Sequence, residues 1–218
     1  MKVGIQLPNY TRPLSDLALE RLRALQPQVL RAFHYVTAEQ LQQVKGAVGT
    51  PLLLLSHPLT GEIDPIPWAR ELIYAAQLAQ GLGFEVWLAP VNEPNHQDGP
   101  YADPASWPRL IAAYGALLAL LWVNLPDVPL ISPNLAVMQN DLLMATQLRP
   151  LFQRHDYIGV NSYWQEDNHT SPDWGLRIDK FRAIYPDKPF VVLEIGDSTP
   201  DRPSSDRAAR IAPILQSF

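Results

Sequence analysis

The chain has 218 residues, of which 47% are hydrophobic and 18% charged, so it can bury a sizeable core. Its formal net charge is −5 and it shows no basic stripe, so no nucleic-acid partner is expected. It has no cysteine, which excludes a disulfide framework and thiolate chemistry. No linker or internal repeat divides it, and we expect one domain over residues 1–218.

The apolar segments favour a protein without a membrane partner. The first eight residues lack the hydrophobic stretch of a secretory signal and instead predict a strand. The longest apolar run, Leu110 to Val123, has about the length of a buried helix. We therefore expect either a cytoplasmic protein or a mature domain cut from a longer one.

Short apolar runs alternate with helical patterns along the whole chain. The expected strands are Lys2–Leu7, Val29–Tyr35, Pro51–Ser56, Glu85–Val91, Leu130–Ser132, Tyr157–Ser162 and Phe190–Glu194. The expected helices are Ser15–Leu25, Ala38–Val48, Ile66–Gly81, Ser106–Leu121, Gln139–Phe152, Leu176–Tyr185 and Ser204–Gln216.

This alternation predicts an α/β fold with a parallel sheet covered by helices. Seven strand–helix units exceed the usual doubly wound sheet and favour a compact (β/α)₈ TIM barrel whose eighth strand is missing or truncated. An open barrel would leave two strand edges unpaired, so a homo-oligomer is a possible outcome.

Two of the expected strands end at a glutamate. Glu93 follows the fourth strand within Asn92-Glu93-Pro94, and Glu194 ends the seventh strand. A carboxylate at the rim of a core is costly unless a partner or a task justifies it, and a salt bridge is the simplest such partner. Because reactive groups of such barrels come from the carboxyl ends of strands, both glutamates are candidate catalytic residues. A facing pair of carboxylates is the apparatus of glycoside hydrolysis.

With these residues the chain resembles the clan A glycoside hydrolases, retaining (β/α)₈ enzymes with an Asn-Glu pair on strand four and a glutamate on strand seven. The closest resemblance is to the cellulase-like family 5, with a strand-six segment, Asp156 to Tyr163, similar to family 1 β-glucosidases. It implies that Glu93 is the acid/base and Glu194 the nucleophile, and that the substrate is an oligo- or polysaccharide.

The same resemblance implies a set of substrate-binding residues: Asn92, Tyr163, Arg31, His57, Asn161 and Trp164. In the family pattern Arg31 and Tyr163 contact the nucleophile, and Asn92 holds the sugar 2-hydroxyl. Asn161 stands where family 5 has a histidine, and the strand-eight tryptophan of that family has no counterpart in this chain. Trp164 is the best candidate for a platform under a sugar ring.

Two alternatives remain open. A barrel that binds glycans without hydrolysing them is the main one, since the eighth strand normally helps to close the cleft; a lyase or isomerase using the same carboxylates is another. The five histidines lack the close spacing of a metal-binding motif, so no metal and no cofactor are expected. The pair His96 and Asp98 is the weak exception, as a conceivable cation site.

Overall fold

A computed structural model describes residues 4–7, 11–136, 140–164 and 173–197, with the backbone alone at 162–164, 173–177 and 195–197. The strands are β1 (Gly4–Gln6), β2 (Val29–Phe33), β3 (Leu52–Ser56), β4 (Val86–Ala89), β5 (Ile158–Trp164) and β6 (Phe190–Asp197). The helices are α1 (Asp16–Leu25), α2 (Ala38–Val48), α3 (Pro65–Gly81), η1 (Pro104–Ser106), α4 (Trp107–Asn124), α5 (Asp141–Gln147), α6 (Arg149–Phe152) and α7 (Asp173–Ile184). The expected helix Ser204–Gln216 lies outside the described residues.

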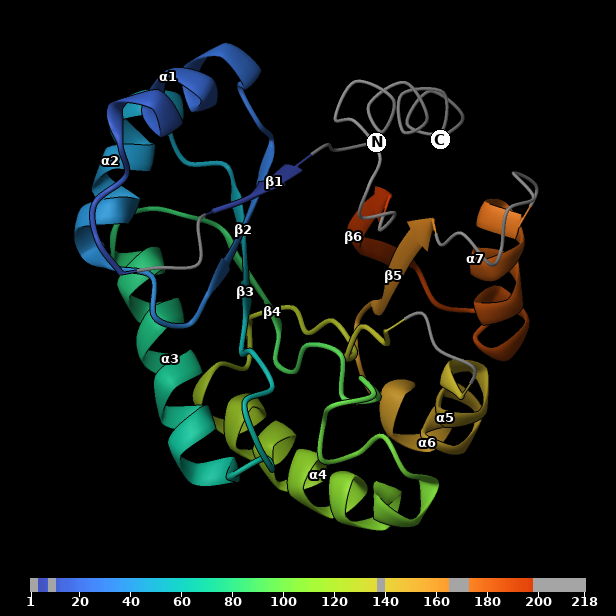
Figure 1. The fold of residues 1–218 in the computed structure, drawn as a ribbon. Coiled ribbons are helices and arrows are strands. Elements are labelled where there is room, and N and C mark those ends of the chain that lie inside the picture. Colours follow the sequence, from blue (N-terminus) through green and yellow to red (C-terminus); the bar gives the residue numbers. More distant parts are fainter. Residues whose placement is uncertain (1–3, 8–10, 137–139, 165–172, 198–218) are drawn as a thin grey trace.

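The strands form a curved parallel layer inside a shell of helices (Figure 1). Strands β1 to β4 pair in sequence order, and β5 pairs with β6. Residues 130–135 connect the two groups through isolated parallel bridges, Leu88 with Leu130 and Ile131 with Tyr157 among them. The expected strand Leu130–Ser132 is therefore present as a bridging segment, and the predicted TIM-barrel architecture is confirmed.

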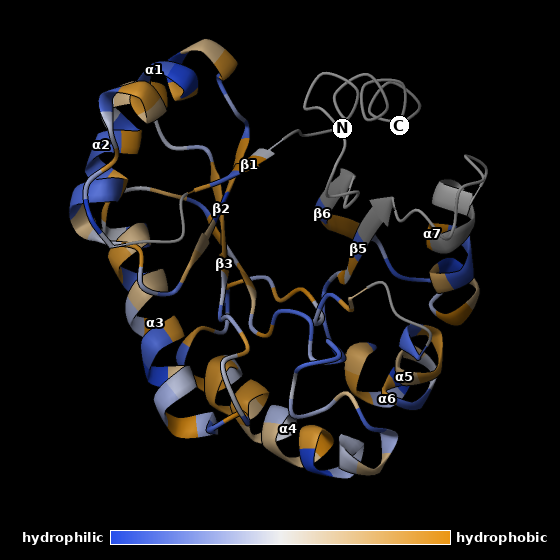
Figure 2. Ribbon diagram, viewed as in Figure 1, coloured by the Kyte–Doolittle hydropathy of each residue, from blue (hydrophilic) through white to orange (hydrophobic). Residues whose placement is uncertain are grey.

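The apolar side chains of the strands form two separate clusters, one on each face of the sheet. On β3, Leu53 and Leu55 join the large cluster that includes helical residues, whereas Leu52 and Leu54 join a small cluster with Ala89 and Ile131. Successive side chains of a strand point to opposite faces, so the small cluster fills the barrel interior and the large one lies under the helices. Figure 2 shows the apolar colour along β2 and β3, and bands of apolar and polar residues along the covering helices.

Helix α4 belongs to the helical shell. By length and composition alone, the segment Pro104–Asn124 could cross a membrane, and it is the one such helix among the residues described. It packs against α3, and its buried side chains Trp107, Leu110, Tyr114, Leu117, Leu118 and Leu121 recur at helical spacing on one face. This packing is that of a helix covering a barrel.

Gly159 allows β5 to approach the bridging segment closely. A Cβ atom at this position would lie 2.5 Å from the backbone oxygen of Ser132 and 3.0 Å from Ile131 Cγ2. The Gly159 amide also donates to Ser132 Oγ at 3.0 Å. A side chain here would push β5 away from its neighbour, and β5 carries part of the candidate site described below.

We predict that Gly159→Ala lowers the free energy of unfolding by about 1–3 kcal/mol, because the methyl group overpacks against backbone. Gly115→Ala is the matched control: it lies within α4 with no atom within 4 Å of an added Cβ. That change should stabilise the protein by about 0.5–1 kcal/mol. Urea unfolding of both variants measures the difference, and equal effects would contradict the close approach.

Candidate active site

A buried arginine links four strand ends across the barrel interior. Arg31 on β2 is 4% exposed, and its Nη1 forms an ion pair with Glu194 on β6. Its Nη2 donates to Asn92 Oδ1 at 2.5 Å, and its Nε donates to Ser56 Oγ at 3.3 Å. Gln6 Oε1 on β1 lies 3.5 Å from Nη1. The guanidinium thus has partners on several sides, which fixes its plane.

Glu194 reaches Arg31 because β6 departs from regular pairing just before it. Val160 pairs with Val192, but the next residue of β5, Asn161, pairs with Glu194, so Leu193 is an extra residue on β6. Leu193 packs into the interior cluster. In a regular strand the residue after it would point outward. The bulge instead turns Glu194 inward, in keeping with the tendency of bulges to re-aim side chains.

Glu93 is turned by a different irregularity. The preceding residue, Asn92, already points inward to Arg31, so a regular strand would direct Glu93 away from the site. Glu93 instead has φ of 47°, in the left-handed region, and its amide donates to the Asn134 carbonyl at 2.9 Å. This conformation costs roughly 1–2 kcal/mol for a residue with a side chain. It lets Glu93 Oε1 accept a hydrogen bond of 2.7 Å from Asn161 Nδ2.

Asn134 completes a continuous chain of hydrogen bonds between the two carboxyl groups. Its side chain is fully buried, and Nδ2 lies 2.8 Å from both Asn92 Oδ1 and Asn161 Oδ1. The chain therefore runs from Glu194 through Arg31 and these three asparagines to Glu93. Asn134 was not among the residues expected from the sequence, although a polar residue two positions after the expected strand Leu130–Ser132 was a usable signal.

The two glutamates have different electrostatic surroundings. Burial raises the pKa of Glu93 above its ordinary value, and the negative charge of Glu194 raises it further. The hydrogen bond from Asn161, then His96 and Arg31, oppose this rise without cancelling it. Glu194 is held in an ion pair with Arg31, which requires its ionised form. The site thus raises the pKa of one carboxyl group and pairs the other with a cation.

The other expected site residues are distributed differently. Asn92 and Asn161 lie in the hydrogen-bond chain, whereas His57 faces away from it toward α3, with Nε2 2.9 Å from Glu71 Oε2. The backbones of Tyr163 and Trp164 pair with Gly196 and Asp197 on β6, but the side chains of both residues lie outside the described part of the chain. Their contacts with a nucleophile or a sugar remain predictions.

Two histidines form a cluster that the sequence spacing did not indicate. Glu71 Oε2 lies 2.9 Å from His57 Nε2 and 3.4 Å from His34 Nε2, and the three ligand-type atoms lie within 4.8 Å of one another. His34 and His57 follow the ends of the adjacent strands β2 and β3, which brings them together despite 22 intervening positions. These residues are the part of the described chain that could hold a metal ion.

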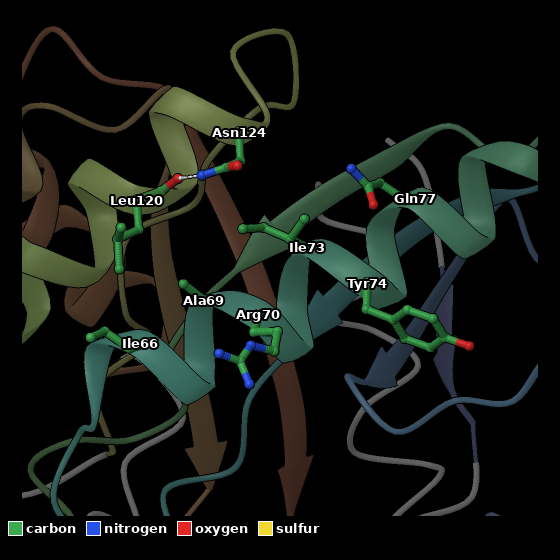
Figure 3. A pocket seen from close by; sticks show the side chains of 8 residues that line it. All are labelled: Ile66, Ala69, Arg70, Ile73, Tyr74, Gln77, Leu120 and Asn124. Atoms are coloured by element: carbon green, nitrogen blue, oxygen red, sulfur yellow. Dashed lines mark hydrogen bonds between the residues drawn. The ribbon is translucent and has the colours of Figure 1, made fainter.

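A hollow of about 430 Å³ lies elsewhere, on the outer surface between α3 and α4 (Figure 3). Its lining includes Ile66, Ile73 and Tyr74 from α3 and Leu120 from α4. None of the candidate site residues lines it, and it offers no carboxylate. It is a groove between two covering helices rather than part of the carboxylate site.

No family model matches this chain, and no curated protein matches it either. Solved structures do. It is similar to a family 128 endo-β-1,3-glucanase from Amycolatopsis mediterranei in complex with laminaripentaose, with a TM-score of 0.62 and 14% identity. The match covers 100% of this chain and 84% of the glucanase.

Two further structures agree. A family 5 cellulase from an Icelandic hot spring isolate gives a TM-score of 0.61 at 15% identity, covering 100% of this chain and 73% of the cellulase. A family 51 α-L-arabinofuranosidase from Bifidobacterium longum gives 0.61 at 10% identity, covering 92% of this chain. This chain spans 56% of that enzyme. At these identities the likeness establishes the fold alone, a TIM-type (β/α) barrel.

The raised pKa of Glu93 predicts a pH-dependent effect on stability. A carboxyl group whose pKa is higher in the folded state stabilises the fold fully below its unfolded pKa, and this contribution is lost as the pH rises through the folded pKa. The side chain introduced by Glu93→Gln does not ionise, so this variant does not lose that contribution to stability as the pH rises. We therefore expect the variant to gain stability relative to the parent between pH 4 and pH 8, in a series of urea unfolding curves.

Glu20→Gln is the control, because Glu20 is an exposed carboxylate on α1. Its stability difference from the parent should change little over the same pH range. A difference for Glu93→Gln that stays flat, or that shrinks with rising pH, would contradict the raised pKa.

Proposed function

We propose that this chain is a glycoside hydrolase that cleaves β-linked glycans with retention of configuration. Glu93 is the acid/base and Glu194 the nucleophile. The observation that carries the proposal is the difference between two neighbouring carboxyl groups: burial and the negative charge of Glu194 raise the pKa of Glu93, while Arg31 forms an ion pair with Glu194. This is the division of roles that the double-displacement mechanism requires.

In the first step, a carboxylate oxygen of Glu194 attacks the anomeric carbon and forms an ester. The glycosidic C–O bond breaks, and the Glu93 carboxyl group gives its proton to the departing oxygen. The ester carries no charge, so the repulsion that raised the pKa of Glu93 disappears once it has formed. The same residue can then act as a base.

In the second step, ionised Glu93 takes a proton from water while the water oxygen attacks the anomeric carbon. The ester bond breaks and Glu194 regains its negative charge beside Arg31. Because each displacement inverts the anomeric carbon, the two together retain its configuration. The hydrogen bond from Asn161 Nδ2 holds the Glu93 carboxyl group in place through both steps.

The similar enzymes support a glycan as the substrate. The glucanase was solved with laminaripentaose bound, and the second similar structure is a cellulase. We infer that a β-linked oligo- or polysaccharide occupies the rim of the barrel. In this proposal Asn92, whose Oδ1 accepts hydrogen bonds from Arg31 and Asn134, orients a sugar hydroxyl next to Glu93.

Glu93→Gln and Glu194→Gln test the proposal on β-1,3-glucan and β-1,4-glucan oligosaccharides. Loss of either group should reduce kcat by about 10²–10⁴-fold or more, since one removes acid/base catalysis and the other covalent catalysis. The exposed Glu20→Gln serves as the control and should retain parental turnover. Reducing-sugar release measures the rates, and NMR of fresh product gives its anomeric configuration.

Azide distinguishes the two roles. With Glu194→Ala, azide should take the place of the nucleophile and give an α-glycosyl azide from a β-glycoside with a good leaving group. With Glu93→Ala, azide should intercept the glycosyl-enzyme and give the β-azide. An inverted product from the parent would overturn retention. Calorimetric binding of oligosaccharides without any cleavage would instead favour the glycan-binding barrel.

A further inference from the structure

The histidine–glutamate cluster lies at the same rim as the carboxylate site but is built from other residues. His34 and His57 each follow a strand end, β2 and β3, and Glu71 projects from α3 toward both of them. We propose that His34, His57 and Glu71 form a binding site for a divalent transition-metal ion, with Zn²⁺ as the best fit. The proposal does not depend on hydrolysis at Glu93 and Glu194.

The separations of the ligand atoms suit a tetrahedral ion. With bonds of about 2.0–2.2 Å, adjacent ligands around Zn²⁺ lie roughly 3.3–3.5 Å apart. Glu71 Oε2 lies 3.4 Å from His34 Nε2 and 2.9 Å from His57 Nε2. A shift of about half an ångström at the end of the Glu71 side chain would bring both distances to the tetrahedral spacing.

The hydrogen bonding of His57 prepares its Nε2 as a ligand. His57 Nδ1 lies 2.8 Å from the Pro58 carbonyl oxygen, which can only accept, so Nδ1 carries the proton. In neutral His57 the Nε2 lone pair then faces the Glu71 carboxylate. Two acceptors at that distance require a cation between them, either a proton or a metal. A ligating histidine commonly donates its other N–H to a backbone carbonyl, as here.

The two rings are held in place by stacking. The His57 ring stacks on Trp68 at 3.6 Å and on His34 at 4.1 Å. This stacking keeps both rings close to Glu71, with His34 Nε2 3.4 Å and His57 Nε2 2.9 Å from its Oε2.

The ligand set selects among ions. Two imidazole nitrogens and one carboxylate oxygen suit Zn²⁺ and its transition-metal neighbours, whereas Mg²⁺ and Ca²⁺ prefer sets of oxygen ligands. The Glu71 side chain is 47% exposed, so an ion can enter and water can fill a fourth position. Bound metal would tie the ends of β2 and β3 to α3.

Two hydrogen bonds through Ser56 connect the histidine–glutamate cluster to the carboxylate site. The His34 amide donates to the Ser56 carbonyl at 2.9 Å, and Ser56 Oγ accepts from Arg31 Nε at 3.3 Å. An ion at this cluster would therefore stiffen the strand ends that position Arg31. It would act as a structural metal beside the site, not as a group that touches a substrate.

The test is metal binding by the full chain after treatment with a chelator. Titration with Zn²⁺ in a calorimeter should give one site per chain with a Kd below about 10 μM. Co²⁺ should give visible absorption bands of a four- or five-coordinate ion. Glu71→Gln and His34→Gln should each weaken Zn²⁺ binding at least about 100-fold, because each removes a ligand.

His96→Ala is the matched control. His96 and Asp98 form an exposed pair, with 3.8 Å between Nδ1 and Oδ2, so its loss should leave Zn²⁺ affinity unchanged. Circular dichroism confirms that each variant is folded. The proposal is overturned if the parent binds no Zn²⁺ up to 1 mM, which would leave a proton shared between His57 and Glu71. It is equally overturned if the two ligand variants bind like the parent.

Discussion

The ion pair between Arg31 and Glu194 is the interaction on which the site depends. It joins β2 to β6 through the barrel interior, where a lone charge would be expensive. Removing either partner would leave the other charged and buried. The pair therefore constrains β2 and β6 at once. The remaining donors of Arg31 are used by Ser56 and Asn92, so the position of one guanidinium sets the rim geometry of several strands.

Both glutamates reach the site through a local departure from regular strand geometry. A bulge at Leu193 turns Glu194 inward, and a left-handed backbone turns Glu93. In a regular barrel the neighbours Asn92 and Leu193 would take the inward positions and the carboxyl groups would face the helices. The fold therefore supplies the scaffold, and two small irregularities supply the facing pair that the proposed chemistry needs.

The architecture could be predicted because it depends on periodic patterns. The runs that became β2, β3 and α2 are apolar at the expected spacing, and their boundaries follow the sequence closely. The expected strand Leu130–Ser132 shortened to isolated bridges, since Pro129 and Pro133 flank it and lack the amide that a ladder needs. Expected strand-end position also indicated Glu93 and Glu194 as candidates, although β6 continues to Asp197, whereas Arg31, in the middle of β2, came from the family resemblance alone.

The rest depends on contacts that no pattern encodes. Asn134 matters because two other asparagines lie within 2.8 Å of its amide nitrogen, and the cluster around Glu71 depends on where α3 packs. His57 resembled a sugar-contacting residue in sequence, yet its ring lies between Trp68 and His34. Burial and neighbouring charge, which govern the pKa of Glu93, likewise appear only in three dimensions.

The backbone conformation that orients the Glu93 side chain also destabilises the fold. Its φ of 47° is a conformation that glycine adopts freely and glutamate does not. A sequence drifting under selection for stability alone would replace this glutamate with glycine or asparagine, and the carboxyl group would vanish with little harm to the barrel. A glutamate there destabilises the local backbone by roughly 1–2 kcal/mol, and under the proposed function its carboxyl group is the reason to keep it.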